Sequence, residues 1–153
     1  MKVLFLDHQG VMYTKKHPCP GKLDPFNTET VNMLNSILEL DATIEIVISS
    51  DWKYWVPLKE MCEFYKTQGI LKTPIAYTPK TANYIWNQYP QQRSKEINTW
   101  LTDNMDANNI TKWVAIDDID MRPHLDNFVW VSKPAEGILQ DGIKDVILRY
   151  LQD

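Results

Sequence analysis

The apolar residues of this chain follow two kinds of spacing, and the two kinds alternate along the sequence. Continuous apolar runs, often rich in β-branched residues, are typical of strands buried on both faces of a parallel sheet. These runs predict strands at 2–7, 43–49, 74–77, 113–117 and 128–131. Apolar residues that recur every three or four positions predict amphipathic helices. They occur at 28–40, 52–67, 92–105 and from Ile143 to Tyr150.

The alternation of strands with helices indicates the fold class. It favours a three-layer α/β domain, in which helices cover a mainly parallel sheet of five strands. The 153 residues are enough for one domain with a substantial core, and we therefore predict a single domain over 1–153. Asn27 and Asp51 are expected to cap the first two helices, and Gly69 is expected to end the second.

Composition and charge restrict the classes of partner. The net charge of −4 makes the chain a poor candidate for broad electrostatic binding to nucleic acid or to an anionic membrane, although a local basic site could still hold a small phosphorylated substrate. Cys19 and Cys62 form no CxxC motif, which favours a reduced, cytoplasmic setting. The first apolar run is too short for a signal peptide, and no stretch has membrane-spanning length. We therefore expect no membrane partner.

Carboxylates follow two of the predicted strands directly. Asp7 comes after the first apolar run, and Asp117 with Asp118 comes at the end of the fourth. In open parallel sheets, ligands bind at the carboxyl ends of the strands. If these two strands are neighbours, the carboxylates meet and can hold a divalent cation between them.

Four segments in order resemble the haloacid dehalogenase-like (HAD) phosphohydrolases. They are the Asp7 strand with Gly10-Val11, the strand Ile46 to Ser49, the cluster Arg93-Ser94-Lys95, and the run Ile116-Asp117-Asp118. Each segment alone is a weak signal, but four in the right order are fairly specific. The resemblance covers most of the chain, points to a small, minimally capped member, and implies a Rossmann-like (HAD-like) fold.

The resemblance implies a nucleophile and a metal site. Asp7 would attack phosphorus and form an aspartyl-phosphate. Mg²⁺ would be the cofactor, held by Asp7, by the backbone carbonyl of Gln9, and by Asp117 or Asp118. The cation would offset the repulsion between the attacking carboxylate and an anionic substrate.

The resemblance also implies a phosphate site. The Ser49 hydroxyl and the Ser50 backbone N–H would bind a phosphate oxygen. A basic residue at the start of the third helix would neutralise the phosphate and the nucleophile, and Lys95 is favoured over Arg93 for this role.

Gln9 departs from the pattern of the family. Its phosphatases usually carry a second aspartate two residues after the nucleophile, which protonates the leaving group and later activates water. The amide of Gln9 cannot transfer a proton at neutral pH, and such help is worth about 10² to 10⁴ in rate. The substrate could therefore carry a good leaving group, or His8, His17 or His124 could supply the proton, or catalysis could be lost while binding is kept.

These observations predict a Mg²⁺-dependent phosphohydrolase acting on a small phosphorylated substrate. One alternative is a catalytically impaired domain that binds phosphate, metal or a partner. Another is a nucleic-acid end phosphatase, because some relatives with a second motif like Ser49-Ser50-Asp51-Trp52-Lys53 are linked to end repair. Cap insertions usually set specificity in this superfamily. The candidates here, 8–26 and 50–92, are small, so we expect an open site.

Overall fold

A computed structural model describes residues 1–14, 23–81 and 89–152. The strands are β1 (Lys2–Leu6), β2 (Ile44–Ile48), β3 (Ala76–Tyr77), β4 (Lys112–Asp117) and β5 (Phe128–Trp130). The α-helices are α1 (Thr28–Leu38), α2 (Leu58–Thr67), α3 (Tyr89–Asn104) and α4 (Ile143–Leu151). Two 3₁₀ helices are η1 (Asp51–Tyr54) and η3 (Gly137–Leu139).

The five strands form one sheet in the order β3-β2-β1-β4-β5, and every neighbouring pair is parallel. The predicted α/β class with a parallel five-stranded sheet is therefore confirmed. β1 lies at the centre, where Leu6 pairs with Ile48 of β2 on one side and with Ile116 of β4 on the other. The first and fourth strands are thus neighbours, which brings the residues that follow them to one edge.

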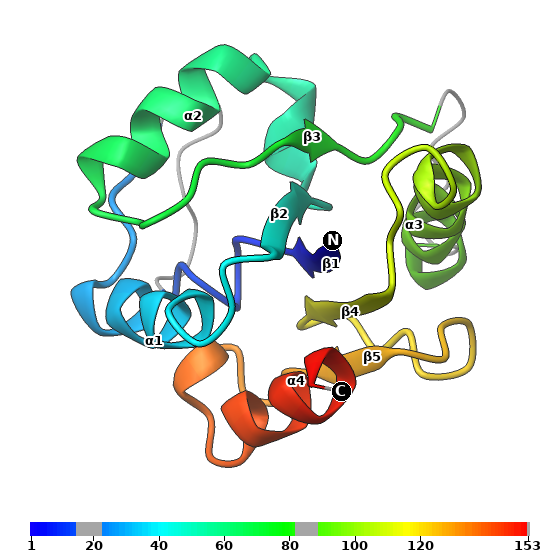
Figure 1. Ribbon diagram of the computed structural model, residues 1–153. Coiled ribbons are helices and arrows are strands. Elements are labelled where there is room, and N and C mark those ends of the chain that lie inside the picture. The colour runs from blue at the N-terminus through cyan, green and yellow to red at the C-terminus, as the bar shows by residue number, and fades with distance from the viewer. Residues whose placement is uncertain (15–22, 82–88, 153) are drawn as a thin grey trace.

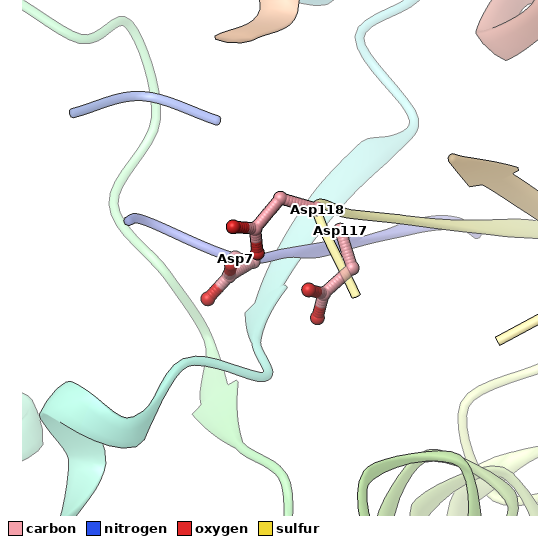
Figure 2. A group of neighbouring side chains, drawn as sticks. All are labelled: Asp7, Asp117 and Asp118. Carbon is pink, nitrogen blue, oxygen red and sulfur yellow. The ribbon is translucent and has the colours of Figure 1, made fainter. Parts of the chain in front are cut away.

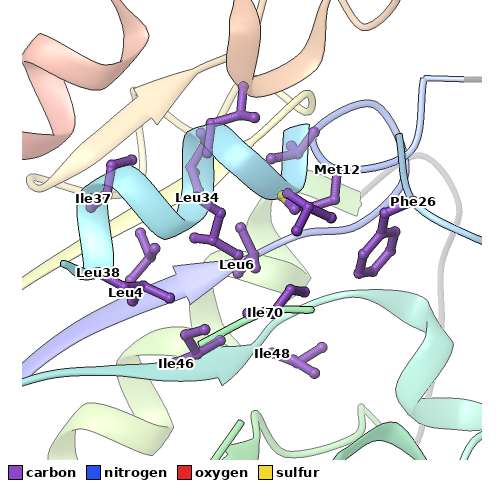
Figure 3. Close-up of a cluster of buried hydrophobic side chains, with 14 of the residues drawn as sticks. Leu4, Leu6, Met12, Phe26, Leu34, Ile37, Leu38, Ile46, Ile48 and Ile70 are labelled. Atoms are coloured by element: carbon purple, nitrogen blue, oxygen red, sulfur yellow. The ribbon is translucent and has the colours of Figure 1, made fainter. Parts of the chain in front are cut away.

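Alternate residues of β1 enter two cores on opposite faces of the sheet. Leu4 and Leu6 pack in the larger core with side chains of α1, α2 and α4. Figure 3 shows the part of this core that α1 covers. Val3 and Phe5 pack in the smaller core with α3, where the Phe5 and Trp100 rings meet edge to face, 5.5 Å apart. Helix α3 therefore covers the face opposite to the other three α-helices (Figure 1). Such two-sided burial explains why β1 is a continuous apolar run.

The second predicted helix is interrupted. Residues 51–54 form η1 and the α-helix begins only at Leu58, because Pro57 occupies the position before the first helical residue. Proline has no N–H to donate and is therefore tolerated only at or near a helix start. At the other end Gly69, with φ +75°, ends α2 as predicted, and its N–H donates to the Lys66 carbonyl.

Two predicted helix caps work differently in the structure. Asn27 lies at the N-cap of α1, but its side-chain oxygen makes no capping bond and instead accepts from the N–H and hydroxyl of Thr14. The residue that caps η1 is Ser50 rather than Asp51, because the Ser50 hydroxyl accepts from the Trp52 N–H at 3.2 Å. The carboxylate of Asp51 is therefore available for a contact outside η1.

The two proposed insertion segments are only partly described. Residues 15–22 of the loop 8–26 and residues 82–88 of the segment 50–92 lie outside the described residues, so their role as caps stays a prediction. The described part of helix α3 already includes Tyr89, three residues before the predicted start. In the described part of the chain, no helix is both long enough and apolar enough to cross a bilayer.

Candidate active site

Three carboxylates converge at the carboxyl edge of the sheet. Asp7 follows β1, Asp117 ends β4, and Asp118 is the next residue. One oxygen from each lies within 4.8 Å of the others, and Figure 2 shows the three side chains gathered between the strand ends. Asp7 and Asp117 are buried, whereas Asp118 is partly exposed. Oxygen-only ligand sets of this kind suit hard cations such as Mg²⁺.

The electrostatics of this cluster fit a bound cation. Burial, and then the charge of Asp117, raise the pKa of Asp7 well above its usual range. The same two causes raise the pKa of Asp118 to about 6. Both shifts arise because several negative charges share a poorly solvated site. A divalent cation would relieve this repulsion, so the residues present are a good match for Mg²⁺.

Gly10 is required for the position of Asp118. Its φ of +77° suits glycine, and a Cβ at this position would lie 2.4 Å from Oδ2 of Asp118. Any larger residue would therefore displace that carboxylate, in addition to the strain of the left-handed backbone. The glycine of the first motif thus connects the Asp7 loop to the acidic end of β4.

Arg93 of α3 supplies the positive charge of the site. Its Nη1 lies 2.8 Å from Oδ2 of Asp117 and 3.3 Å from Oδ1 of Asp7, and its Nη2 lies 2.9 Å from Oδ1 of Asp51. The guanidinium is buried and stands 4.7 Å from the ring centroid of Tyr89. Burial opposes its charge, but Asp117, Asp7 and Asp51 outweigh that effect and raise the pKa of Arg93.

Ser49 has the position and the free hydroxyl of a phosphate ligand. It is the first residue after β2, as Asp7 is the first after β1, and the register of these strands sets the two residues side by side. Its Oγ is buried and has no hydrogen-bond partner among the described residues. A buried unpaired hydroxyl costs about 1–3 kcal/mol, and a bound oxyanion would satisfy it.

A pocket of about 460 Å³ opens beside Asp7, Arg93 and Asp118, whereas the buried Ser49 and Asp117 lie behind its lining. It has room for a phosphate group and for part of the molecule that carries it. The exposed side chain of Gln9 is part of its wall. The residues that line the pocket are Asp7, Gln9, Ser50, Asp51, Trp52, Tyr89, Arg93, Asp118 and Ile119.

Lys95 is not brought to this pocket. It is exposed and lines a separate surface hollow together with Asn98, Thr99 and other residues of α3. Residues two apart on a helix point in nearly opposite directions. Because Ile97 faces the sheet, Arg93 one turn earlier shares that face and Lys95 does not. This spacing could have distinguished the two basic residues in the sequence.

The described histidines also lie outside the pocket lining. His8 is buried, with Nε2 2.6 Å from the Tyr65 hydroxyl. Burial and the nearby charge of Arg93 lower the pKa of His8 to about 3, so its ring is neutral at pH 7 and cannot act as a general acid. His124 is exposed and lines the hollow that contains Lys95. His17 lies outside the described residues.

A second buried ion pair lies beside the site. The ammonium of Lys53 pairs with Glu96 of α3 and donates to the Thr78 hydroxyl and the Pro79 carbonyl, both at 3.0 Å. Burial lowers the pKa of Lys53, and Glu96 opposes that effect. This pair links η1 to the helix that carries Arg93. The sequence motif contains Lys53, but no spacing rule indicates that Glu96 is its partner.

Comparison with known protein families agrees with this geometry. A family model described as the HAD domain in Swiss Army Knife RNA repair proteins matches residues 3–141, which include every candidate site residue. No curated protein and no solved structure gave a match. Since the family model spans most of the chain, the protein belongs to the family of HAD domains found in Swiss Army Knife RNA repair proteins.

Proposed function

We propose that this HAD domain is a Mg²⁺-dependent phosphohydrolase that works through an aspartyl-phosphate on Asp7. Membership of the HAD family implies a phosphohydrolase-type or RNA-repair-related function. The observation that carries the more specific proposal is the position of Asp7. This residue follows the central strand, between the carboxylates at the end of β4 on one side and Ser49 after β2 on the other, and it lines an open pocket.

The metal would be held by Asp7, Asp118 and the backbone carbonyl of Gln9. Asp118 is the better candidate for direct contact because it lines the pocket, whereas both oxygens of Asp117 are engaged, one by Arg93 and one by the Ile119 N–H at 2.9 Å. Asp117 would then orient the guanidinium beside the metal. When bound, Mg²⁺ offsets the negative charge of the nucleophile and the phosphate.

The protein groups around the pocket would bind the phosphate and carry out the two chemical steps. The Ser49 hydroxyl and the Ser50 backbone N–H would donate to phosphate oxygens, and Arg93 would balance their charge. An oxygen of Asp7 would attack phosphorus while the bond from phosphorus to the leaving oxygen breaks. Water would then hydrolyse the aspartyl-phosphate, which releases inorganic phosphate and regenerates the carboxylate.

Gln9 limits the range of leaving groups. Its side chain lines the pocket where the usual acid would stand, and it can donate a hydrogen bond without giving up a proton. Substrates whose leaving oxygen is stable as an anion, such as aryl or acyl phosphates, are therefore favoured over alkyl phosphates.

The terminal phosphate of a polynucleotide is the second candidate substrate. The description of the matching family names RNA repair, and the pocket lining includes the partly exposed Tyr89, whose ring could contact a base. The acidic net charge of −4 weighs against extended backbone contacts. Phosphate release from oligonucleotides with a 5′- or a 3′-terminal phosphate, compared with an unphosphorylated control, tests this candidate.

The main proposal is tested with an aryl phosphate, with and without Mg²⁺, for the wild type and Asp7→Asn. The wild type should release phosphate only with the metal, and the variant should be inactive. Equal rates for the two proteins would overturn the proposal. Binding of Mg²⁺ or phosphate by calorimetry, without turnover of any phosphoester in a broad panel, would instead support a binding domain.

A further inference from the structure

We infer that Asp51 is the general base that activates water in the second half of the reaction, in the role that the side chain of Gln9 cannot fill. This inference rests on the proposed function, because it concerns hydrolysis of the aspartyl-phosphate on Asp7. It assigns a catalytic role to a residue that the sequence analysis predicted as a helix cap and named within the second motif, without a chemical role.

The register of the sheet relates Asp51 to Gln9. Leu6 of β1 pairs with Ile48 of β2 in a parallel arrangement. Gln9 lies three residues beyond Leu6, and Asp51 lies three residues beyond Ile48. The two residues thus occupy the same offset after adjacent strands, and both line the same pocket. A carboxylate missing from the loop after β1 is therefore present in the loop after β2.

The contacts of Asp51 keep its carboxylate near the nucleophile. Its Oδ1 lies 2.9 Å from Nη2 of Arg93, while Nη1 of the same guanidinium lies 3.3 Å from Oδ1 of Asp7. Neighbouring nitrogens of one rigid, planar group therefore hold the two carboxylates. The other oxygen of Asp51 accepts from the Tyr89 hydroxyl. With 46% of its side chain accessible, Asp51 keeps contact with the water of the pocket.

The other described groups that line the pocket are unsuited to this task. Asp7 is occupied as the nucleophile, and Asp118 is the proposed metal ligand. The amide of Gln9 has no basic atom at neutral pH. The phenol of Tyr89 is a donor to Asp51 rather than a base. An ion-paired carboxylate such as Asp51 can accept a proton, and each of its oxygens has capacity for a further hydrogen bond.

Hydrolysis of the aspartyl-phosphate would transfer one proton from water to Asp51. The oxygen of a pocket water bonds to phosphorus, and the bond between phosphorus and the Asp7 oxygen breaks, with the electron pair returning to that carboxylate. The proton lost by the water passes to Asp51, which later releases it to solvent. Inorganic phosphate leaves, and Asp7 is free for another turnover.

Rapid-mixing kinetics with an aryl phosphate separate the two halves of the reaction. For Asp51→Asn we expect a burst of one phenol per active site at the wild-type rate, followed by a steady state about 10² to 10⁴ slower. Acid-quenched protein should carry phosphate on Asp7.

Two further variants test whether a carboxylate is what the step needs. Asp51→Glu, which keeps a carboxylate, should retain more of the steady-state rate, and Gln9→Asp should restore turnover to Asp51→Asn. The exposed Asp106→Asn is the matched control for the change of charge.

Two results would overturn the inference. One is an unchanged steady-state rate in Asp51→Asn. The other is a burst that slows in parallel with the steady state and leaves no phosphorylated protein, because Asp51 would then only position Arg93. Failure of the proposed function is a different result, since the wild type itself would then show no Mg²⁺-dependent release of phenol.

Discussion

Arg93 on α3 and Asp117 at the end of β4 form a buried ion pair, with 2.8 Å between Nη1 and Oδ2. The pair joins the helix that covers one face of the sheet to the carboxyl edge that holds the three carboxylates. It also places a fixed positive charge beside Asp7. Removing one partner of a buried pair leaves an uncompensated charge in the interior. The resulting loss of stability is larger than the stabilisation that the intact pair provides.

We therefore expect Arg93→Met and Lys95→Met to behave very differently, although the residues are two apart. Arg93→Met should lower the free energy of unfolding of the metal-free protein by about 3–5 kcal/mol and reduce turnover of an aryl phosphate at least about 100-fold. Lys95→Met should change either quantity little. Urea unfolding and steady-state kinetics measure both effects. A larger loss of activity in Lys95→Met would contradict the assignment.

Ser49→Ala should weaken phosphate binding without destabilising the free protein. The Ser49 hydroxyl is buried and unpaired, so its removal relieves a cost rather than breaking a hydrogen bond. We expect about a tenfold loss of phosphate affinity, equivalent to one hydrogen bond to a charged group. The control is Ser50→Ala, which removes the cap on η1 and should cost about 1 kcal/mol of stability. Calorimetry and thermal unfolding of both variants provide the comparison.

Gly10→Ala should disrupt the acidic cluster, whereas Gly69→Ala should not. The two glycines have almost the same φ, +77° and +75°, so both substitutions carry a strain of about 1 kcal/mol. Only at Gly10 would the new Cβ meet a neighbour, the carboxylate of Asp118, while nothing lies within 4 Å at Gly69. Mg²⁺ affinity, measured by calorimetry, should fall only in Gly10→Ala. Equal affinities in both variants would mean that Asp118 does not hold the metal.

The stability of the metal-free protein should depend on pH through Asp118. Folding raises its pKa from 3.8 to about 6, so the folded state favours the protonated carboxyl. The resulting stabilisation is complete below pH 4 and is lost as the pH rises through 6. Relative to Asp118→Asn, the wild type should lose roughly 1–2 kcal/mol between pH 4 and 7, after allowance for solvent screening of this partly exposed group.

Urea unfolding in a chelator, at several pH values, measures that difference between wild type and Asp118→Asn. Saturating Mg²⁺ should remove the dependence, because the cation favours the ionised carboxylate. A difference between the two proteins that does not change with pH would show that Asp118 titrates normally.

Much of the fold could be predicted because its signals are local or strongly patterned. The apolar run from Val3 to Leu6 is long and unbroken, which identifies a central strand, and Gly69 ends a helix in a conformation that suits glycine. The interruption near Pro57 is a local effect that the helical spacing of the apolar residues concealed. Asn27 lies at a helix start, but its side-chain oxygen accepts a hydrogen bond from Thr14 in the preceding loop instead of capping the helix.

The candidate site was predictable only where a motif ends a strand. Asp7, Ser49 and Asp117 each follow or end a buried run, and parallel register brings such positions together. Arg93 and Asp51 depend instead on how α3 rotates against the sheet and on which residue caps η1. Helical spacing from Ile97 places Arg93 on the buried face of α3, but the pairing of Arg93 with Asp51 joins residues 42 apart in sequence, and no local spacing encodes that partner.

The proposed chemistry is tested most directly by a crystal structure of the protein with Mg²⁺ and beryllium trifluoride, a mimic of the phosphoryl group. We expect the fluoride complex on an oxygen of Asp7, within hydrogen-bond distance of Ser49 Oγ, and a cation contacted by Asp7 and Asp118. A cation bound elsewhere, or a fluoride complex that avoids Asp7, would contradict it.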